Sequence, residues 1–192
     1  MEETDEEGRR QLRKCRIEIL YPYIVWQKSY QLCRLRGLST EIRSFCFKLI
    51  HQILPFKDRT SQLMRNNNSQ CQLCNQNITE TPIHGLFLCS RNNEAAELIL
   101  AYTRPFDSTI TAEKMLKLDL NVTDRIYELP TTLIAATGLY QIWVNRKNKK
   151  GTAPYQIRAE LECLISLLRR SRSRKCRETG NMIENTLQNF HY

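Results

Sequence analysis

The chain lacks both a long apolar run and a secretory signal. Its longest apolar stretch, LIAATGLYQIWV at 133–144, has 12 residues and contains Thr137, Gly138 and Gln141, so it is too short and too polar to span a bilayer. A signal peptide begins with a basic segment followed by an apolar one, whereas residues 1–7, MEETDEE, carry five acids and no base. We therefore expect no contact with a membrane and a location in the nucleus or the cytoplasm, where stable disulfides are rare.

Grouped carboxylates and phosphate-binding loops are also missing. The chain has five aspartates, none adjacent to another, and no glycine-rich phosphate loop. Magnesium-dependent polymerases and nucleases need clustered acidic ligands, and no Ser-His-Asp or Cys-His set stands out beyond the cysteine cluster described below. We therefore expect that the protein is not an enzyme. A thiol-dependent enzyme is the remaining catalytic alternative, which metal-free, redox-active protein would favour.

Strand signals are few, so the sequence predicts a mostly α-helical fold. A hydrophobic content of 41% and a charged content of 26% in 192 residues are typical of one packed domain or two small ones. We expect a charged, disordered N-terminus at 1–14, a helical domain at 15–170 and a basic C-terminal tail with a weak helix at 171–192. Helical patterns occur at 19–35, 39–54, 58–65, 93–104, 111–118, 123–147 and 155–170. Within 123–147 we expect a short helix followed by a longer one that begins near Pro130. Ser39 or Thr40, Asp58 and Thr111 are the expected N-caps.

Four potential metal ligands lie in the stretch CQLCNQNITETPIHGLFLC at 71–89. Cys71, Cys74, His84 and Cys89 have the spacing C-x2-C-x9-H-x4-C. Three thiolates and one imidazole saturate Zn²⁺ and leave no open position, which predicts one structural zinc in a CCHC knuckle. Sulfur ligands also favour zinc over magnesium or calcium. We expect the zinc module to occupy about 56–100, with a small β-hairpin at IHGLFL.

Other interpretations of these cysteines are weaker. A thioredoxin-type C-x-x-C pair needs a βαβ unit, whereas an Asn-rich loop precedes Cys71. An iron–sulfur cluster usually takes four cysteines, and the stretch is too polar for a core of free thiols. Elsewhere, Cys33, Cys46 and Cys163 lie on apolar helix faces and are predicted core residues. Cys15 and Cys176 lie among basic residues and are predicted to be exposed.

Several segments together resemble the reverse transcriptase zinc-binding domain, the C-terminal CCHC region of LINE-type (non-LTR) retrotransposon polyproteins. They are RSFCFKLIHQILPFKDRTSQLMR, CQLC, ETPIHGLFLC and LYQIWVNR. In that family a helix ending in Leu-Pro is followed by a short Arg-bearing helix and the cluster, with Glu-Thr before the histidine and a downstream Trp followed by Arg. The matching positions are Leu54-Pro55, Arg59, Cys71, Cys74, Glu80-Thr81, His84, Cys89, Trp143 and Arg146. The resemblance covers about residues 38–170.

The resemblance implies a non-enzymatic accessory domain that binds RNA or DNA during target-primed reverse transcription. In the family this domain follows a polymerase that holds magnesium on a pair of adjacent aspartates. That pair is missing from this chain. The sequence therefore resembles the accessory module without the polymerase.

The formal net charge of +9 favours a polyanionic partner, most commonly nucleic acid. Two basic runs, NRKNKK at 145–150 and RRSRSRKCR at 169–177, follow predicted helices. Part of their role is expected to be favourable interaction with helix C-termini, and the second also fits a nuclear-import signal. We expect contact with phosphates rather than bases. The predicted nucleic-acid-binding residues are Arg146, Lys147, Lys149, Lys150, Arg169, Arg170, Arg172, Arg174, Lys175 and Arg177.

A second hypothesis needs no nucleic acid. Zinc would only hold the fold of a structural or protein-interaction domain, and the basic residues would simply be solvated. The spread of arginine and lysine separates the two hypotheses. Basic residues gathered on one face favour nucleic acid, and basic residues on different faces favour the alternative.

Overall fold

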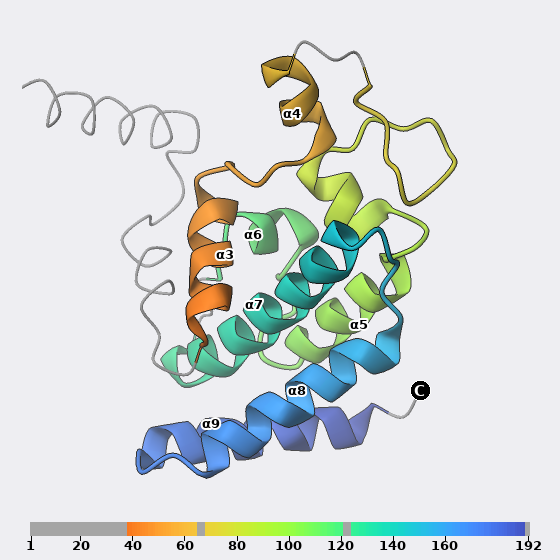
Figure 1. The fold of residues 1–192 in the computed structure, drawn as a ribbon. Helices are drawn as coiled ribbons and strands as arrows, with labels where there is room; N and C mark the ends of the chain where they lie inside the picture. Colours follow the sequence, from red (N-terminus) through yellow and green to blue (C-terminus); the bar gives the residue numbers. More distant parts are fainter. Residues whose placement is uncertain (1–37, 65–67, 121–123, 191–192) are drawn as a thin grey trace, which may run out of the picture.

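The computed structural model describes residues 38–64, 68–120 and 124–190. Its elements are helices, which confirms the mostly α-helical class (Figure 1). Pairing between strands in these ranges is limited to one isolated antiparallel bridge, between Gln70 and Thr79. The elements are α3 (Thr40–Ile50), α4 (Lys57–Leu63), the π-helix η1 (His84–Leu88), α5 (Asn93–Thr103), α6 (Ala112–Leu116), α7 (Arg125–Lys147), α8 (Pro154–Arg169) and α9 (Arg174–Asn189).

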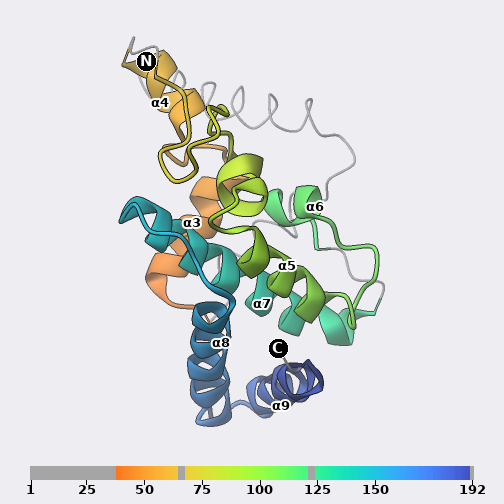
Figure 2. The ribbon, with the colours of Figure 1, turned by 90° about the vertical axis from the view of Figure 1, so that its right-hand side faces the viewer.

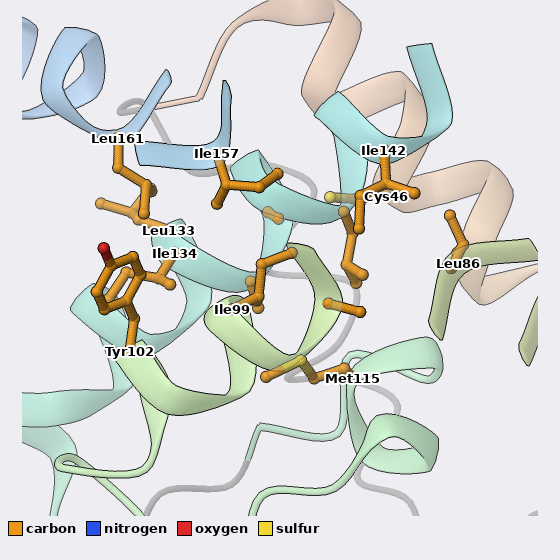
Figure 3. Close-up of a cluster of buried hydrophobic side chains, with 14 of the residues drawn as sticks. Cys46, Leu86, Ile99, Tyr102, Met115, Leu133, Ile134, Ile142, Ile157 and Leu161 are labelled. Atoms are coloured by element: carbon orange, nitrogen blue, oxygen red, sulfur yellow. The ribbon is translucent and has the colours of Figure 1, made fainter. Parts of the chain in front are cut away.

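The 23-residue helix α7 lies at the centre of the core. Because it is apolar on most of its circumference, it can pack against several neighbours at once, and it contacts α3, α5, α8, α9 and η1. Leu133, Ile134 and Ile142 are fully buried. In Figure 3 they lie beside Leu161 of α8, Tyr102 of α5 and Cys46 of α3, respectively. A single helix starting at Arg125 replaces the two that we expected, and Pro130 lies inside it.

α5 and α7 approach each other closely at Gly138. A Cβ atom on this glycine would lie 2.6 Å from both Cγ1 and Cδ1 of Ile99, a side chain of α5 that is fully buried. A methyl group would therefore have to displace packed atoms. The glycine sets the distance between the two helices.

α8 and α9 form an antiparallel pair at the opposite end of the molecule from α4 (Figure 2). α9 has 16 residues and begins within the second basic run, where the Ser173 side chain accepts a hydrogen bond from the Cys176 backbone. Ile183 and Leu187 are buried against the core. The segment that we expected to be a tail with a weak helix thus carries a packed helix.

Several sequence expectations change in the structure. The segment IHGLFL contains the π-helix His84–Leu88, so the hairpin predicted there is wrong. Cys46 is buried as predicted, but Cys163 is exposed because it faces away from the buried stripe of α8, and Cys176 is partly buried against the core. The predictions for 1–14, 19–35, Cys15 and Cys33 lie outside the described residues. Within the described ranges, no helix has both the length and the apolar composition needed to cross a membrane.

Candidate metal centre

The four predicted ligands converge on one point. Cys71 and Cys74 come from the loop between α4 and η1, His84 begins η1, and Cys89 follows it. All four are buried, and their ligand atoms lie within 4.8 Å of one another. Cys71 Sγ lies 3.8 Å from Cys89 Sγ, and Cys74 Sγ lies 3.3 Å from His84 Nε2. This buried Cys₃His cluster can hold a metal ion.

Backbone hydrogen bonds fold the loop that carries Cys71 and Cys74. The Cys71 N–H donates to the Ile78 carbonyl at 2.9 Å, and the Glu80 N–H donates to the Ser69 carbonyl at 2.8 Å. Asn77 has a φ of 53°, a left-handed conformation that asparagine adopts more readily than most residues. The loop therefore turns back on itself, and its single bridge is the only feature resembling a hairpin among the described residues of this module.

The π-helix explains the spacing between His84 and Cys89. In an α-helix, residues five apart point about 140° away from each other, since each turn takes 3.6 residues. A π-turn instead joins residues i and i+5 by a hydrogen bond, and the Cys89 N–H donates to the His84 carbonyl at 2.7 Å. Both side chains can then face the same centre, which is why this segment is helical rather than extended.

Burial makes the unliganded thiols unfavourable as anions. It raises the pKa of the Cys71 thiol, and raises the pKa of Cys89 to about 12. Burial also lowers the pKa of the His84 imidazole, although the nearby Glu80 carboxylate opposes that change. A bound cation would supply the charge that stabilises the thiolates.

Glu80, nine residues after Cys71, joins the metal centre to the rest of the fold. Its carboxylate accepts hydrogen bonds from Arg146 Nε at 2.8 Å, from Arg146 Nη2, and from the Lys57 backbone N–H at 3.3 Å. The Cys71 Sγ lies 3.8 Å from the same carboxylate. Glu80 is only 2% exposed, so these partners compensate for burying its charge. The expected cap, Asp58, instead lies inside the first turn of α4, where it accepts a hydrogen bond from the Arg59 backbone N–H at 2.7 Å.

The environment of Arg146 argues against its predicted contact with nucleic acid. Its guanidinium forms the ion pair with Glu80 and lies 4.5 Å from the centre of the Phe56 ring and 5.1 Å from that of Trp143. The side chain is 9% exposed, and a buried carboxylate holds it, so it is not placed to bind phosphate. Glu80 was not among the predicted site residues. The sequence indicated Glu80 only through the Glu-Thr pair before His84. In the structure, Glu80 forms an ion pair with Arg146 of the downstream Trp-Arg pair.

The remaining basic residues divide into two groups. Lys147, Lys149 and Lys150 are exposed at the end of α7, near the metal centre. The second group surrounds the turn between α8 and α9. α8 has 16 residues, so its length of about 24 Å separates the groups. Figure 1 shows α8 running from the side of the end of α7 to the turn before α9. The two basic runs therefore do not form one patch.

Half of the second group already has partners. Arg169 pairs with Glu184, Arg174 pairs with Glu178, and Arg177 donates to the carbonyls of Ser171 and Arg172. No ion pair within the described ranges involves the other three, which are all exposed. These are Arg170, Arg172 and Lys175.

Comparisons of the chain with models of protein families, with curated proteins and with solved structures found no match. Functional inference therefore depends on the chemistry of the residues themselves.

Proposed function

We propose that the protein is a non-enzymatic, zinc-stabilised helical domain that binds RNA or DNA, as its resemblance to the retrotransposon zinc-binding region implies. The observation that carries the proposal is the closed, buried Cys₃His cluster. A tetrahedral zinc with ligands at about 2.3 Å for sulfur and 2.0 Å for nitrogen separates two sulfurs by about 3.8 Å, and a sulfur from a nitrogen by about 3.5 Å. The distances of 3.8 and 3.3 Å between the ligand atoms agree with such a site.

The ligand set supports a structural role for zinc. Four protein ligands leave no coordination position for water or substrate, whereas catalytic zinc sites keep one open. Each ligand is at most 7% exposed, which also restricts the access of a substrate to the thiols. The cluster thus supports a role in holding the fold and not one in catalysis.

The nucleic-acid role is supported by charge and position. Three exposed lysines, Lys147, Lys149 and Lys150, follow Arg146 directly, and the Arg146–Glu80 ion pair ties that end of α7 to the metal-binding loop. Folding of the metal module would therefore place these lysines relative to the loop. The overall charge of +9 adds a longer-range attraction for phosphates.

Metal analysis and a salt titration test the proposal. We expect one zinc per chain by mass spectrometry, and less in Cys74→Ser, while Cys163→Ser serves as a control because Cys163 is exposed and outside the cluster. Electrophoretic mobility shifts with RNA and DNA should show affinity that falls steeply with salt. Full zinc content in Cys74→Ser would overturn the metal assignment. Absent or salt-independent binding would overturn the nucleic-acid role.

One observation favours the alternative of a structural or protein-interaction domain. The two basic runs lie at opposite ends of α8, and Arg146, Arg169 and Arg174 are engaged in ion pairs. Under this alternative the protein would still contain one zinc per chain, but no nucleic acid would copurify with it. The mobility shifts distinguish the two functions directly.

A further inference from the structure

We propose that a cleft beside the metal centre binds an unpaired nucleic-acid strand, a proposal that rests on the function proposed above. The cleft has a volume of about 610 Å³ and lies between α3, α4, the metal-binding loop and the end of α7. We call it the lysine cleft because Lys48, Lys57, Lys147 and Lys149 line it. Only the last two were among the predicted contacts. Lys48 and Lys57 are distant in sequence from Lys147 and Lys149, and the fold brings all four to the same cleft.

The charges lining the lysine cleft suit an anionic ligand. Glu80 and Arg146 are both at its wall, but they neutralise each other in their ion pair. Among the other described residues that line the cleft, Glu41 is the one carboxylate opposed to the four lysines. None of these lysines forms an ion pair with another described residue. The cleft therefore has a net positive charge, which attracts phosphate groups.

The cleft also has an apolar surface that a phosphate alone would not need. Leu73 of the metal-binding loop, Met64 beyond α4 and Tyr140 of α7 line it. Tyr140 is partly exposed, and the buried Phe45 packs edge-on against its ring at 5.7 Å between centroids. Aromatic and apolar side chains beside a basic groove are the features on which exposed bases stack.

This combination selects an unpaired strand over a duplex. A duplex presents phosphates outward and keeps its base faces stacked, so it cannot place a base against Tyr140 without unstacking. A volume of about 610 Å³ is in the range of sites that enclose small ligands, so it suits a short run of nucleotides and not the side of a helix. We assign phosphate contact to the four lysines and base stacking to Tyr140.

Lys149 offers a substitution that removes charge with little risk to the fold. Its φ is 56°, in the left-handed region that glycine adopts without steric cost. Lys147 is exposed at the end of α7. We therefore use Lys147→Gln combined with Lys149→Gly. The matched control is Arg104→Gln combined with Lys114→Gln, which removes two charges outside the cleft and outside both basic runs.

The experiment measures the fluorescence anisotropy of a labelled oligouridylate, and of the same strand annealed to its complement, across a salt titration. We expect the metal-loaded protein to bind the single strand more tightly. The cleft double variant should weaken that binding and reduce the magnitude of the negative slope of log affinity against log salt by about 1.4, at about 0.7 for each phosphate that the variant no longer neutralises. The control double variant should leave the slope unchanged.

A second pair of variants tests stacking separately from charge. Tyr140→Leu should weaken single-strand binding by about tenfold and leave the salt slope unchanged. Tyr140→Phe keeps the ring and should retain wild-type affinity. Zinc content and circular dichroism confirm that each variant is folded.

The outcomes separate this inference from the proposed function. If the single strand binds with normal salt dependence but the cleft variants behave like their controls, the lysine cleft is not the site and the proposed function stands. If the duplex binds as tightly and depends on the same residues, the preference for an unpaired strand is wrong. If neither probe binds at any salt concentration, both the inference and the nucleic-acid role fail.

Discussion

At the scale of single residues, Glu80 connects more of the structure than any metal ligand does. It contacts the metal-binding loop through Cys71, the first turn of α4 through Lys57, and α7 through Arg146. The first two segments are neighbours in the chain, whereas Arg146 lies 66 residues from Glu80. The carboxylate is nearly fully buried. Removing its charge would leave the guanidinium of Arg146 buried without its counter-ion.

The Glu80→Gln variant should therefore be strongly destabilised. We expect the free energy of unfolding of the metal-loaded protein to fall by about 3 kcal/mol, since breaking one side of a buried ion pair leaves an uncompensated charge. Chemical denaturation followed by circular dichroism measures this. The control is Glu162→Gln, which breaks the exposed pair with Arg158 and should cost less than about 1 kcal/mol. Equal losses in the two variants would contradict the role given to Glu80.

A substitution at Lys149 should instead stabilise the protein. Its left-handed backbone costs an ordinary residue about 1 kcal/mol relative to glycine, so Lys149→Gly should raise the free energy of unfolding by about that amount. The comparison is Lys147→Gly, which introduces glycine into α7 and should lower the same quantity. Thermal and urea denaturation would reveal the difference. A loss of stability in Lys149→Gly would mean that the lysine side chain contributes packing that outweighs its strained backbone.

At the scale of elements, periodicity identified helices well but located their ends less well. The apolar stripes of α3 and α8 were visible in sequence, and the Ser39 and Thr111 side chains accept the expected capping hydrogen bonds. Helix ends were harder to predict, because the usual signal is a glycine in the left-handed position just after the helix. Here Gln52, Leu118 and Lys149 adopt positive φ, whereas none of the described glycines does.

The candidate site could also be predicted only in part from the sequence, because some of its features depend on tertiary packing. Ligand identity depends on spacing, which is local, so the four ligands were correctly grouped. The π-turn at His84 and the pairing of Glu80 with Arg146, 66 residues apart, depend on tertiary packing. For Arg146, a basic run suggested solvent exposure, and a buried carboxylate from another segment determined its actual environment.

The crossing of α5 and α7 gives a prediction at this scale. Gly138→Ala should lower the free energy of unfolding by about 1–3 kcal/mol, because its methyl group would overlap the buried Ile99. Gly180→Ala in α9 is the comparison. There the nearest atom would be Leu168 Cβ at 3.2 Å, and alanine is intrinsically favourable in a helix by about 1 kcal/mol. Denaturation midpoints should therefore rank Gly138→Ala well below Gly180→Ala, and the reverse order would contradict the close crossing.

At the scale of the whole molecule, the metal module and the helical core are stabilised differently. Cys71, Cys74 and Cys89 form a small cluster with Leu73, separate from the main core of α3, α5, α7, α8 and α9. So few apolar contacts cannot stabilise a loop strongly. We therefore expect the module to depend on a bound metal, while the core has extensive packing of its own.

Metal removal should accordingly loosen one part of the molecule. After chelation we expect faster amide hydrogen exchange at 68–89 and in α4, and continued protection in the buried middle of α7. This is narrower than the module of about 56–100 expected from sequence, because α5 packs directly on α7. Hydrogen exchange followed by mass spectrometry, with and without zinc, resolves these regions. Uniform loss of protection would show that the metal holds the entire fold.

The π-turn has a consequence for how such a chain can vary in length. Residues 75–79, between Cys74 and the buried Glu80, form an exposed loop, where insertions and deletions are tolerated. The segment from His84 to Cys89 is fixed by one i to i+5 hydrogen bond, so a deletion within it would rotate Cys89 away from the centre. Homologous chains that keep the site should therefore differ in length before the histidine and keep the H-x4-C interval constant.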